Sequence, residues 1–260
     1  AGSRGIANMP ETLREICSFL RDKQCEPFIV PAMGSHGGAT AQGQIEVLRS
    51  LGVTEEYVGA PIRSSMEASC IYEFPDGFKV YVDAAAFSAD GIVVVNRIKP
   101  HTSFRGAYES GLMKMMTVGL GKQLGADQIH RLGPGHMGES IERGGKKILE
   151  LAHVLFGVAL LENGYDQTCG IEVLFPDEII EKEPGLQEQS KNNMPHILFG
   201  NLDLLIVDRI GKNISGPGMD PNITFTFNPS SGIPTDQKAK RIVILDLTDE
   251  THGAAVGMGN

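Results

Sequence analysis

Several patterns that mark specialised protein classes are missing from this chain. It has no Trp, and its four cysteines (Cys17, Cys25, Cys70 and Cys169) form no Cys-x-x-Cys pair. This scatter lacks the ligand spacing of iron–sulfur clusters and structural zinc sites, and it fits free thiols in a reducing cytoplasm. No apolar run approaches the roughly 20 residues that a membrane-spanning helix needs. We therefore expect a cytoplasmic protein without a membrane partner.

Positive charge is also scarce. The chain has 23 Lys and Arg against 32 Asp and Glu, which gives a net charge of −9. General nucleic-acid binders need clustered Lys and Arg, so we expect no nucleic-acid partner. Three basic residues nevertheless lie close together in the sequence: Arg97, Lys99 and Arg105. In an acidic protein, such a local cluster favours a small anionic ligand.

The pattern of apolar residues is that of an α/β protein. Strands are predicted over residues 28–33, 78–82, 91–95, 154–161, 204–207 and 242–245, and helices over residues 10–22, 41–51, 111–118, 137–151 and 176–194. Strands that alternate with helices of this length predict βαβ units and mostly parallel sheets. We expect two α/β domains with a ligand cleft between them.

The length of the chain supports two domains, because 260 residues exceed the usual size of one compact core. The polar segment 181–193 predicts the boundary, and we expect a helix break near Pro184. A larger Rossmann-like unit would span residues 1–190, and a smaller α/β unit residues 191–260. The chain begins without Met and stops after a glycine-rich stretch, so we expect missing segments at both ends and an incomplete smaller unit.

His36 directly follows the predicted strand 28–33, in the turn Gly34-Ser35-His36-Gly37-Gly38. Ligands of α/β proteins bind at the carboxyl ends of strands, and glycines let a ligand approach the backbone. This pattern predicts His36 as a catalytic side chain. The turn could instead be a phosphate cradle in which His36 is incidental, or a simple turn. It matches neither the P-loop nor the GxGxxG fingerprint.

His101 follows the apolar strand 91–95, in the segment Asn96-Arg97-Ile98-Lys99-Pro100-His101-Thr102. Pro100 ends the strand and stiffens the turn, which suits a side chain with a fixed direction. Histidines at the ends of two parallel strands can face one crevice. A pair of bases near neutral pH suits proton transfer on two mirror-image substrates. The alternative is a lone surface histidine.

Lys114 stands inside the apolar segment Gly111-Leu112-Met113-Lys114-Met115-Met116. Burial lowers the pKa of a lysine towards nucleophilic use. The alternative is a lysine that extends along a helix surface to solvent. His130 ends the segment 125–130 and carries no signal of its own, whereas Arg4 and Lys212 lie on predicted loops as candidate carboxylate or phosphate binders.

Taken in order, these motifs resemble those of the lactate racemase family, whose members use a nickel-pincer nucleotide. The resemblance rests on Gly34-Ser35-His36, Pro100-His101, Ser110-Gly111-Leu112-Met113-Lys114 and His130, and it covers roughly residues 1–220. It is strongest to a branch with the signature Asn-Arg-Ile-Lys-Pro-His-Thr. The resemblance implies a cofactor cleft between the two α/β domains.

The resemblance also implies a role for each motif. Lys114 would carry the cofactor, nickel bound to pyridinium-3,5-bisthiocarboxylic acid mononucleotide, through a covalent thioamide link. His130, sixteen residues later, would be the protein ligand of the nickel; sulfur donors with an imidazole in a square plane suit Ni(II). His36 and His101 correspond to the catalytic histidines. The remaining expected contacts are Gly34, Ser35, Gly37, Ser110 and Gly111 with the cofactor, and Arg4, Arg105 and Lys212 with the substrate.

The implied activity is that of an isomerase, a racemase or epimerase of a 2-hydroxy acid. One histidine would remove the hydroxyl proton, hydride would pass reversibly to the cofactor ring, and the other histidine would act as acid after hydride return to the opposite face. Two other functions stay open: a non-enzymatic small-anion or metal-binding α/β protein, and a nucleotide-dependent dehydrogenase, which the lack of GxGxxG disfavours. The sequence leaves the substrate and the oligomeric state open.

Overall fold

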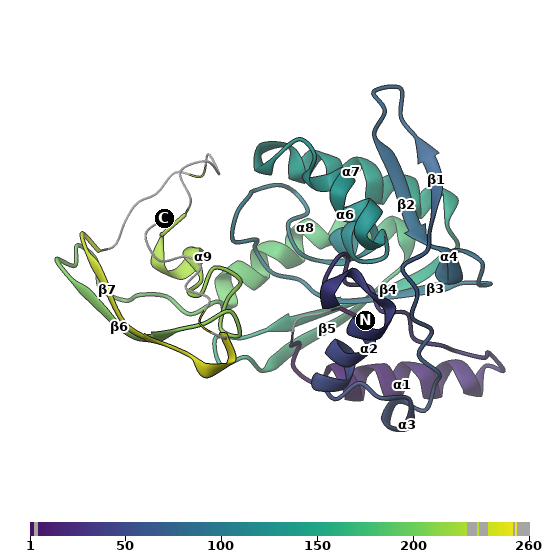
Figure 1. Cartoon of the computed structure of the whole chain (residues 1–260), viewed down its shortest axis with the longest axis horizontal. Helices are drawn as coiled ribbons and strands as arrows, with labels where there is room; N and C mark the ends of the chain where they lie inside the picture. The colour runs from purple at the N-terminus through teal and green to yellow at the C-terminus, as the bar shows by residue number, and fades with distance from the viewer. Residues whose placement is uncertain (3–4, 228–232, 234–238, 252, 254–260) are drawn as a thin grey trace.

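Figure 1 shows a computed structural model of the chain, in which helices pack around short sheets. The structure describes residues 1–2, 5–227, 233, 239–251 and 253. The helices are α1 (Met9–Asp22), η1 (Gly37–Ala39), α2 (Ala41–Ser50), α3 (Glu55–Val58), α4 (Ala84–Phe87), α5 (Leu112–Lys114), the π-helical η2 (Met115–Gly119), α6 (Lys122–His130), α7 (Pro134–Leu151), α8 (Pro176–Asn193), α9 (Pro221–Thr224) and η4 (Asp249–Thr251). The strands are β1 (Ala68–Glu73), β2 (Lys79–Asp83), β3 (Ile92–Arg97), β4 (Val154–Glu162), β5 (Thr168–Leu174), β6 (Leu205–Ile210) and β7 (Ile242–Leu247).

The central sheet has the strand order β3-β4-β5. β3 and β4 run parallel, in a register that starts with Ile92 opposite Val154 and ends with Arg97 opposite Leu160. β5 runs antiparallel to β4; β1 and β2 form an antiparallel pair, and β6 and β7 a parallel pair. The predicted α/β class is confirmed. The prediction of mostly parallel sheets is wrong, because the described strands form as many antiparallel pairs as parallel ones.

The error comes from two strands without an apolar run, β1 and β5. Four of the seven residues of β5 are exposed, and β1 has no fully buried residue. Such strands lack the continuous apolar signal of a doubly buried strand. Conversely, the apolar segment 28–33 was predicted as a strand, but within the described residues it forms a single parallel bridge, between Ile29 and Ile62.

The central sheet is covered on both faces, with α7 above it and α1 below it in Figure 1. Successive residues of a strand point to opposite faces. Val94 of β3 accordingly packs in the core that contains Ile141 and Ile148 of α7, whereas Val95 packs in the core that contains Leu13 of α1. This two-sided burial holds β3 in place, and the loop that follows β3 carries His101.

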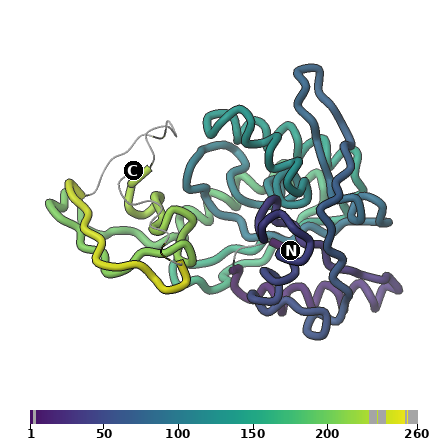
Figure 2. Tube along the Cα trace, viewed as in Figure 1, coloured from purple at the N-terminus to yellow at the C-terminus, as the bar shows by residue number. Residues whose placement is uncertain are grey.

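Helix α8 packs against β4 and β5 and runs through Pro184 without interruption, so the predicted helix break is wrong. The segments after α8, drawn in green to yellow, gather at one end of the molecule in Figure 2. The division into residues 1–190 and 191–260 stays a prediction. Within the described part of the chain, no helix combines the length and apolarity needed to cross a membrane.

Candidate functional site

Residues 99–110, the His101 loop, connect β3 to α5. A bridge closes the neck of this loop, where the Lys99 N–H donates to the Ser110 carbonyl oxygen at 2.8 Å. Asn96 at the end of β3 donates its side-chain amide to the Gly111 carbonyl oxygen, also at 2.8 Å. Both ends of the loop are therefore held next to the end of β3. Lys114 follows the neck of the loop by only a few residues.

A buried carboxylate, Glu109, holds the loop from inside. Glu109 is 1% exposed. Its Oε2 accepts the backbone N–H of His101 at 2.8 Å and the Arg105 Nη1 at 3.2 Å, and Lys191 of α8 lies 3.7 Å from its Oε1. The backbone N–H of Glu109 donates to the Gln187 side chain of α8 at 2.7 Å. Glu109 thus fixes the backbone of His101, a role that the sequence analysis did not identify.

The side chains of His101 and Lys114 share one aromatic neighbour, the buried ring of Phe104. The ring centroids of His101 and Phe104 lie 4.3 Å apart, and the Lys114 Nζ lies 5.8 Å from the Phe104 centroid. An ammonium group at this distance from a ring is attracted to the electron-rich face. The ring of Phe104 is therefore a neighbour of both the imidazole and the amine.

Electrostatics place His130 in the same group. Burial and the charges of Lys114, Lys99, His130 and Arg105 lower the pKa of His101 to about 2. Burial and the Lys114 charge also lower the pKa of His130 below its ordinary value. Both imidazoles are therefore neutral at neutral pH, the form that can accept a proton or bind a metal. His101, Lys114 and His130 are thus close enough for their charges to interact, and the roles predicted for them stay predictions.

The loop that carries His36 packs beside the elements that carry Lys114 and His130. The Gly34 N–H donates to the Gly119 carbonyl oxygen of η2 at 3.2 Å. Gly34 has φ +59°, and a Cβ there would lie 3.2 Å from the Val118 carbonyl oxygen. Gln44 donates to the carbonyl oxygens of Gly34 and His36, at 2.9 and 3.2 Å. The His36 side chain is exposed on this loop.

A second lysine, Lys122, supports the segment that leads to His36. Lys122 is fully buried, and its Nζ donates to the Pro31 carbonyl oxygen at 2.6 Å and to Gln44 at 3.3 Å. Asp83 lies 3.0 Å from the same Nζ. Burial lowers the pKa of Lys122, and the Asp83 carboxylate opposes that shift. The sequence does not indicate this pair, because a lysine between glycines gives no sign that it is buried.

Arg105 joins the His101 loop to α9 and to the segment that follows α9. Its Nη1 donates to the His101 carbonyl oxygen at 2.7 Å, and its Nη2 donates to the Asn222 side chain at 2.6 Å. Its guanidinium carbon lies 4.8 Å from the centroid of Phe227. Asn222 also donates to the His101 carbonyl oxygen, at 3.3 Å. Arg105 is thus engaged in protein contacts, and its predicted role in substrate binding stays a prediction.

Two further residues were predicted to bind the substrate, Lys212 and Arg4, and no contact of either with the His101 loop is described. Lys99 lies 3.5 Å from Asp220, a second contact between the loop and the later segment. Lys212 is exposed, and its backbone N–H donates to Thr251 at 3.1 Å. Within the described ranges, no hydrogen bond or ion pair joins Lys212 to the His101 loop. Arg4 lies outside the described residues.

The predicted cofactor contacts also have structural roles. Gly37 has φ +67°, and a Cβ there would lie 2.6 Å from the backbone of α2. A Cβ at Gly111 would lie 2.2 Å from the Oε1 of Glu183, a residue of α8. The carbonyl oxygens of Ser35 and Ser110 accept backbone hydrogen bonds. The backbone of α2 therefore requires glycine at Gly37, whereas a Cβ at Gly111 would have to displace the Glu183 side chain. Cofactor contact by these residues stays a prediction.

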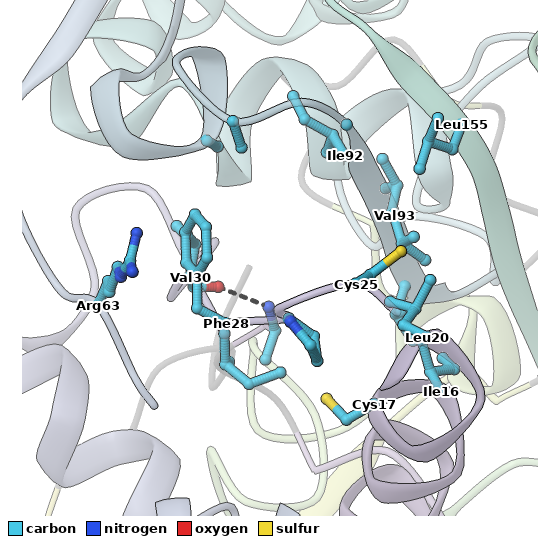
Figure 3. Close-up of a pocket in the computed structure, with 18 of the residues that line it drawn as sticks. Ile16, Cys17, Leu20, Cys25, Phe28, Val30, Arg63, Ile92, Val93 and Leu155 are labelled. Carbon is cyan, nitrogen blue, oxygen red and sulfur yellow. Dashed lines mark hydrogen bonds between the residues drawn. The ribbon is translucent and has the colours of Figure 1, made fainter. Parts of the chain in front are cut away.

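A cavity of about 700 Å³ lies elsewhere, beside the amino-terminal half of β3. Figure 3 shows Ile92 and Val93 on one side of this cavity and Phe28 and Val30 on the other. None of His36, His101, Lys114 and His130 lines it. Because ligands of α/β proteins bind at the carboxyl ends of strands, we place the candidate site at the His101 loop and not in this cavity.

Several solved structures have a fold similar to that of this chain. The lactate racemase apoprotein from Thermoanaerobacterium thermosaccharolyticum matches with a TM-score of 0.51 and 15% identity, over 76% of this chain and 50% of that chain. A structural-genomics protein from Thermotoga maritima matches with a TM-score of 0.61 and 14% identity, over 81% of this chain and 57% of that chain. No family model and no curated protein matches.

Both matches cover only part of the other structure. This chain spans about half the length of each of the two structures. At such low identity the likeness concerns the backbone arrangement and not the chemistry of the site. The comparisons therefore show one thing, that this chain shares the α/β fold of the lactate racemase apoprotein.

Proposed function

We propose that this chain is a nickel-pincer nucleotide-dependent racemase or epimerase of a 2-hydroxy acid. The observation that carries the proposal is the grouping of His101, Lys114 and His130 beside one loop, in a fold shared with the lactate racemase apoprotein. The finer features, namely the nickel, the covalent cofactor and the substrate class, rest on the motif resemblance together with this grouping.

The donor set of the chain fits such a cofactor. Among the described residues, no three or more His, Cys, Asp or Glu side chains gather as a metal site. The cofactor that the motif resemblance implies would bring carbon and sulfur donors of its own and would need one imidazole from the protein. His130 would supply that imidazole as a neutral ligand, and the half-buried Lys114 would supply the amine that holds the cofactor. When bound, the cofactor would supply a hydride acceptor.

The acid–base chemistry belongs to the histidines. A base that removes the hydroxyl proton of a 2-hydroxy acid must be neutral, which His101 is, but a pKa of about 2 makes it a weak base in the unloaded chain. An anionic substrate beside His101 would raise this pKa towards the range that proton transfer needs. His36, on the glycine-rich loop beside η2, would serve the substrate of opposite hand. The ammonium of Lys99 lies in the His101 loop, and its positive charge would favour a substrate carboxylate. Arg4, Arg105 and Lys212 stay candidate contacts for that carboxylate.

The test is covalent loading of the chain. The wild type, Lys114→Ala and the control Lys146→Ala are each expressed with the cofactor biosynthesis genes, and intact mass and nickel content are measured. We expect the adduct and about one nickel per chain in the wild type and in Lys146→Ala, whose lysine lies on α7, and neither in Lys114→Ala. An adduct that persists in Lys114→Ala contradicts the proposal. A wild type without nickel favours the non-enzymatic small-anion binder.

A further inference from the structure

A second buried carboxyl group, Glu183 of α8, lies at the start of the helical segment that carries Lys114. Glu183 is fully buried, and its Oε2 accepts the backbone N–H of Met113 at 3.1 Å. Its Oε1 faces Gly111 and has no hydrogen-bond partner among the described residues. The first N–H groups of a helix have no partner inside the helix, so a carboxyl group there satisfies them. Glu183 therefore caps the segment whose next residue is Lys114.

Two neighbouring groups on α8 hold the rest of the His101 loop. Pro184 has no N–H, so the carbonyl oxygen of Ile180, four residues earlier, has no helical partner. The Tyr108 hydroxyl donates to that oxygen at 2.8 Å. One turn after Glu183, the Gln187 side chain accepts the Glu109 N–H at 2.7 Å and donates to the Gly106 carbonyl oxygen at 3.0 Å. Pro184, which predicted a helix break, thus leaves the Ile180 carbonyl oxygen available to accept a hydrogen bond from the His101 loop.

These contacts connect α8 to both ends of the site. Glu183 reaches Lys114 through Met113, and Gln187 reaches His101 through Glu109, whose carboxylate accepts the His101 N–H. Both groups lie on one face of one helix, because residues four apart are neighbours on a helix surface. The helix itself is fixed to the central sheet through β4.

We propose that Glu183 is a positioning residue that sets where the Lys114 amine lies relative to His101, by binding the amino-terminal end of α5. This inference rests on the proposed function only in taking Lys114 as the attachment point. Gln187 has the matching role for His101. Glu183 and Lys114 are separate residues, so an experiment can contradict the positioning role of Glu183 without contradicting the attachment at Lys114.

The test compares three variants of the full chain. Glu183→Leu removes the acceptor, Glu183→Gln keeps an oxygen that can accept the Met113 N–H, and Glu181→Leu makes the same change at an exposed position of α8. Amide hydrogen exchange at Met113 is measured by NMR in the unloaded chain, and adduct formation at Lys114 by intact mass. We expect exchange at least ~10-fold faster and adduct formation severalfold lower in Glu183→Leu, with the other two like the wild type.

Two results would overturn the inference: unchanged exchange at Met113 in Glu183→Leu, or faster exchange with unchanged adduct formation. If Glu183→Leu does not fold, Glu183→Asp replaces it. The side chain of Asp is one methylene shorter, so its carboxyl group does not reach the Met113 N–H. The same two results would then overturn the inference. A wild type that forms no adduct contradicts the proposed function. A wild type and a Glu183→Leu variant that load equally contradict the positioning role alone.

Discussion

The backbone N–H of Ser103 donates to the Nδ1 of His101 at 3.1 Å. In a neutral imidazole, the nitrogen that accepts leaves the proton on the other nitrogen. We therefore predict that unloaded His101 is the Nε2–H tautomer from pH 5 to 8. Nitrogen-15 NMR of the imidazole checks this, with the exposed His136 as an internal control. A proton found on Nδ1 would contradict the prediction. The tautomer bears on catalysis, because His101 can act as a base through Nε2 only if its proton moves to Nδ1 and the hydrogen bond from Ser103 is broken.

The charge of Lys114 is the second cause, after burial, of the low pKa of His101, and it also lowers the pKa of His130. Lys114→Met removes this charge while it keeps most of the side-chain volume. We predict that the pKa of both histidines rises in Lys114→Met, as measured by NMR titration. Lys240→Met, at an exposed lysine next to β7, should leave both pKa values unchanged. Equal titration curves in the wild type and Lys114→Met would show that the three groups do not lie together.

Much of the fold could be predicted from apolar periodicity, and the two missed strands share one cause. β3, β4, β6 and β7 contain β-branched or leucine-rich runs, and the amphipathic α1 and α7 contain apolar residues at helical spacing, so each was found. β1 and β5 gain their structure from pairing with a neighbour and not from their own apolar pattern. Pairing partners are set by tertiary contacts, which a local pattern does not report.

The residues of the candidate site also fall into those that a local sequence pattern indicates and those that it does not. The sequence singles out His101 because it follows an apolar strand, Lys114 because it interrupts an apolar segment, and His130 only through its spacing from Lys114 in the family motif. It does not single out Glu109 and Glu183, since a glutamate in a polar stretch predicts a solvated side chain. Both are buried only because α8 covers the His101 loop. Burial of a charged group by a distant helix leaves no trace in the residues around it.

Lys122 and Asp83 form a fully buried ion pair under the His36 loop. Removing one partner of such a pair leaves a buried charge without compensation, which costs roughly 3–5 kcal/mol. We predict a loss of this size in the free energy of unfolding for Lys122→Met, measured by urea denaturation. The double variant Lys122→Met/Asp83→Asn should recover part of it, because the remaining charge is gone. A loss below about 0.5 kcal/mol, as for an ordinary surface site such as Lys240→Met, would contradict the pair.

Arg105 and Asn222 connect the His101 loop to α9. Lysine cannot reproduce the contacts of the guanidinium, so Arg105→Lys should loosen this connection. We predict that amide exchange over residues 220–227 becomes roughly 10-fold faster in Arg105→Lys and in Asn222→Ala, and that the double variant adds little, because both remove one interaction. Hydrogen exchange with mass spectrometry measures this. Fully additive effects would mean that the two residues act separately; Arg209→Lys, at an exposed position of β6, is the control.

Glu183 should make the stability of the chain fall as the pH rises. Burial raises its pKa from 4.5 to about 8, against the opposing hydrogen bonds from the backbone of Met113 and Leu112. Between these values the folded chain holds a proton that the unfolded chain has released, so the free energy of unfolding falls by roughly 1.4 kcal/mol for each pH unit. Glu183→Gln has no such proton. The Ala1 amino terminus, whose pKa burial lowers to about 5, and the buried histidines take up protons on unfolding in both proteins, so the two stability curves are compared by their difference. Between pH 6.5 and 8 we predict that the free energy of unfolding of the wild type, measured by urea denaturation, declines by this amount relative to that of Glu183→Gln. Parallel stability curves for the two proteins would mean that Glu183 is ionised in the fold, and the cap on Met113 would then be a charged one.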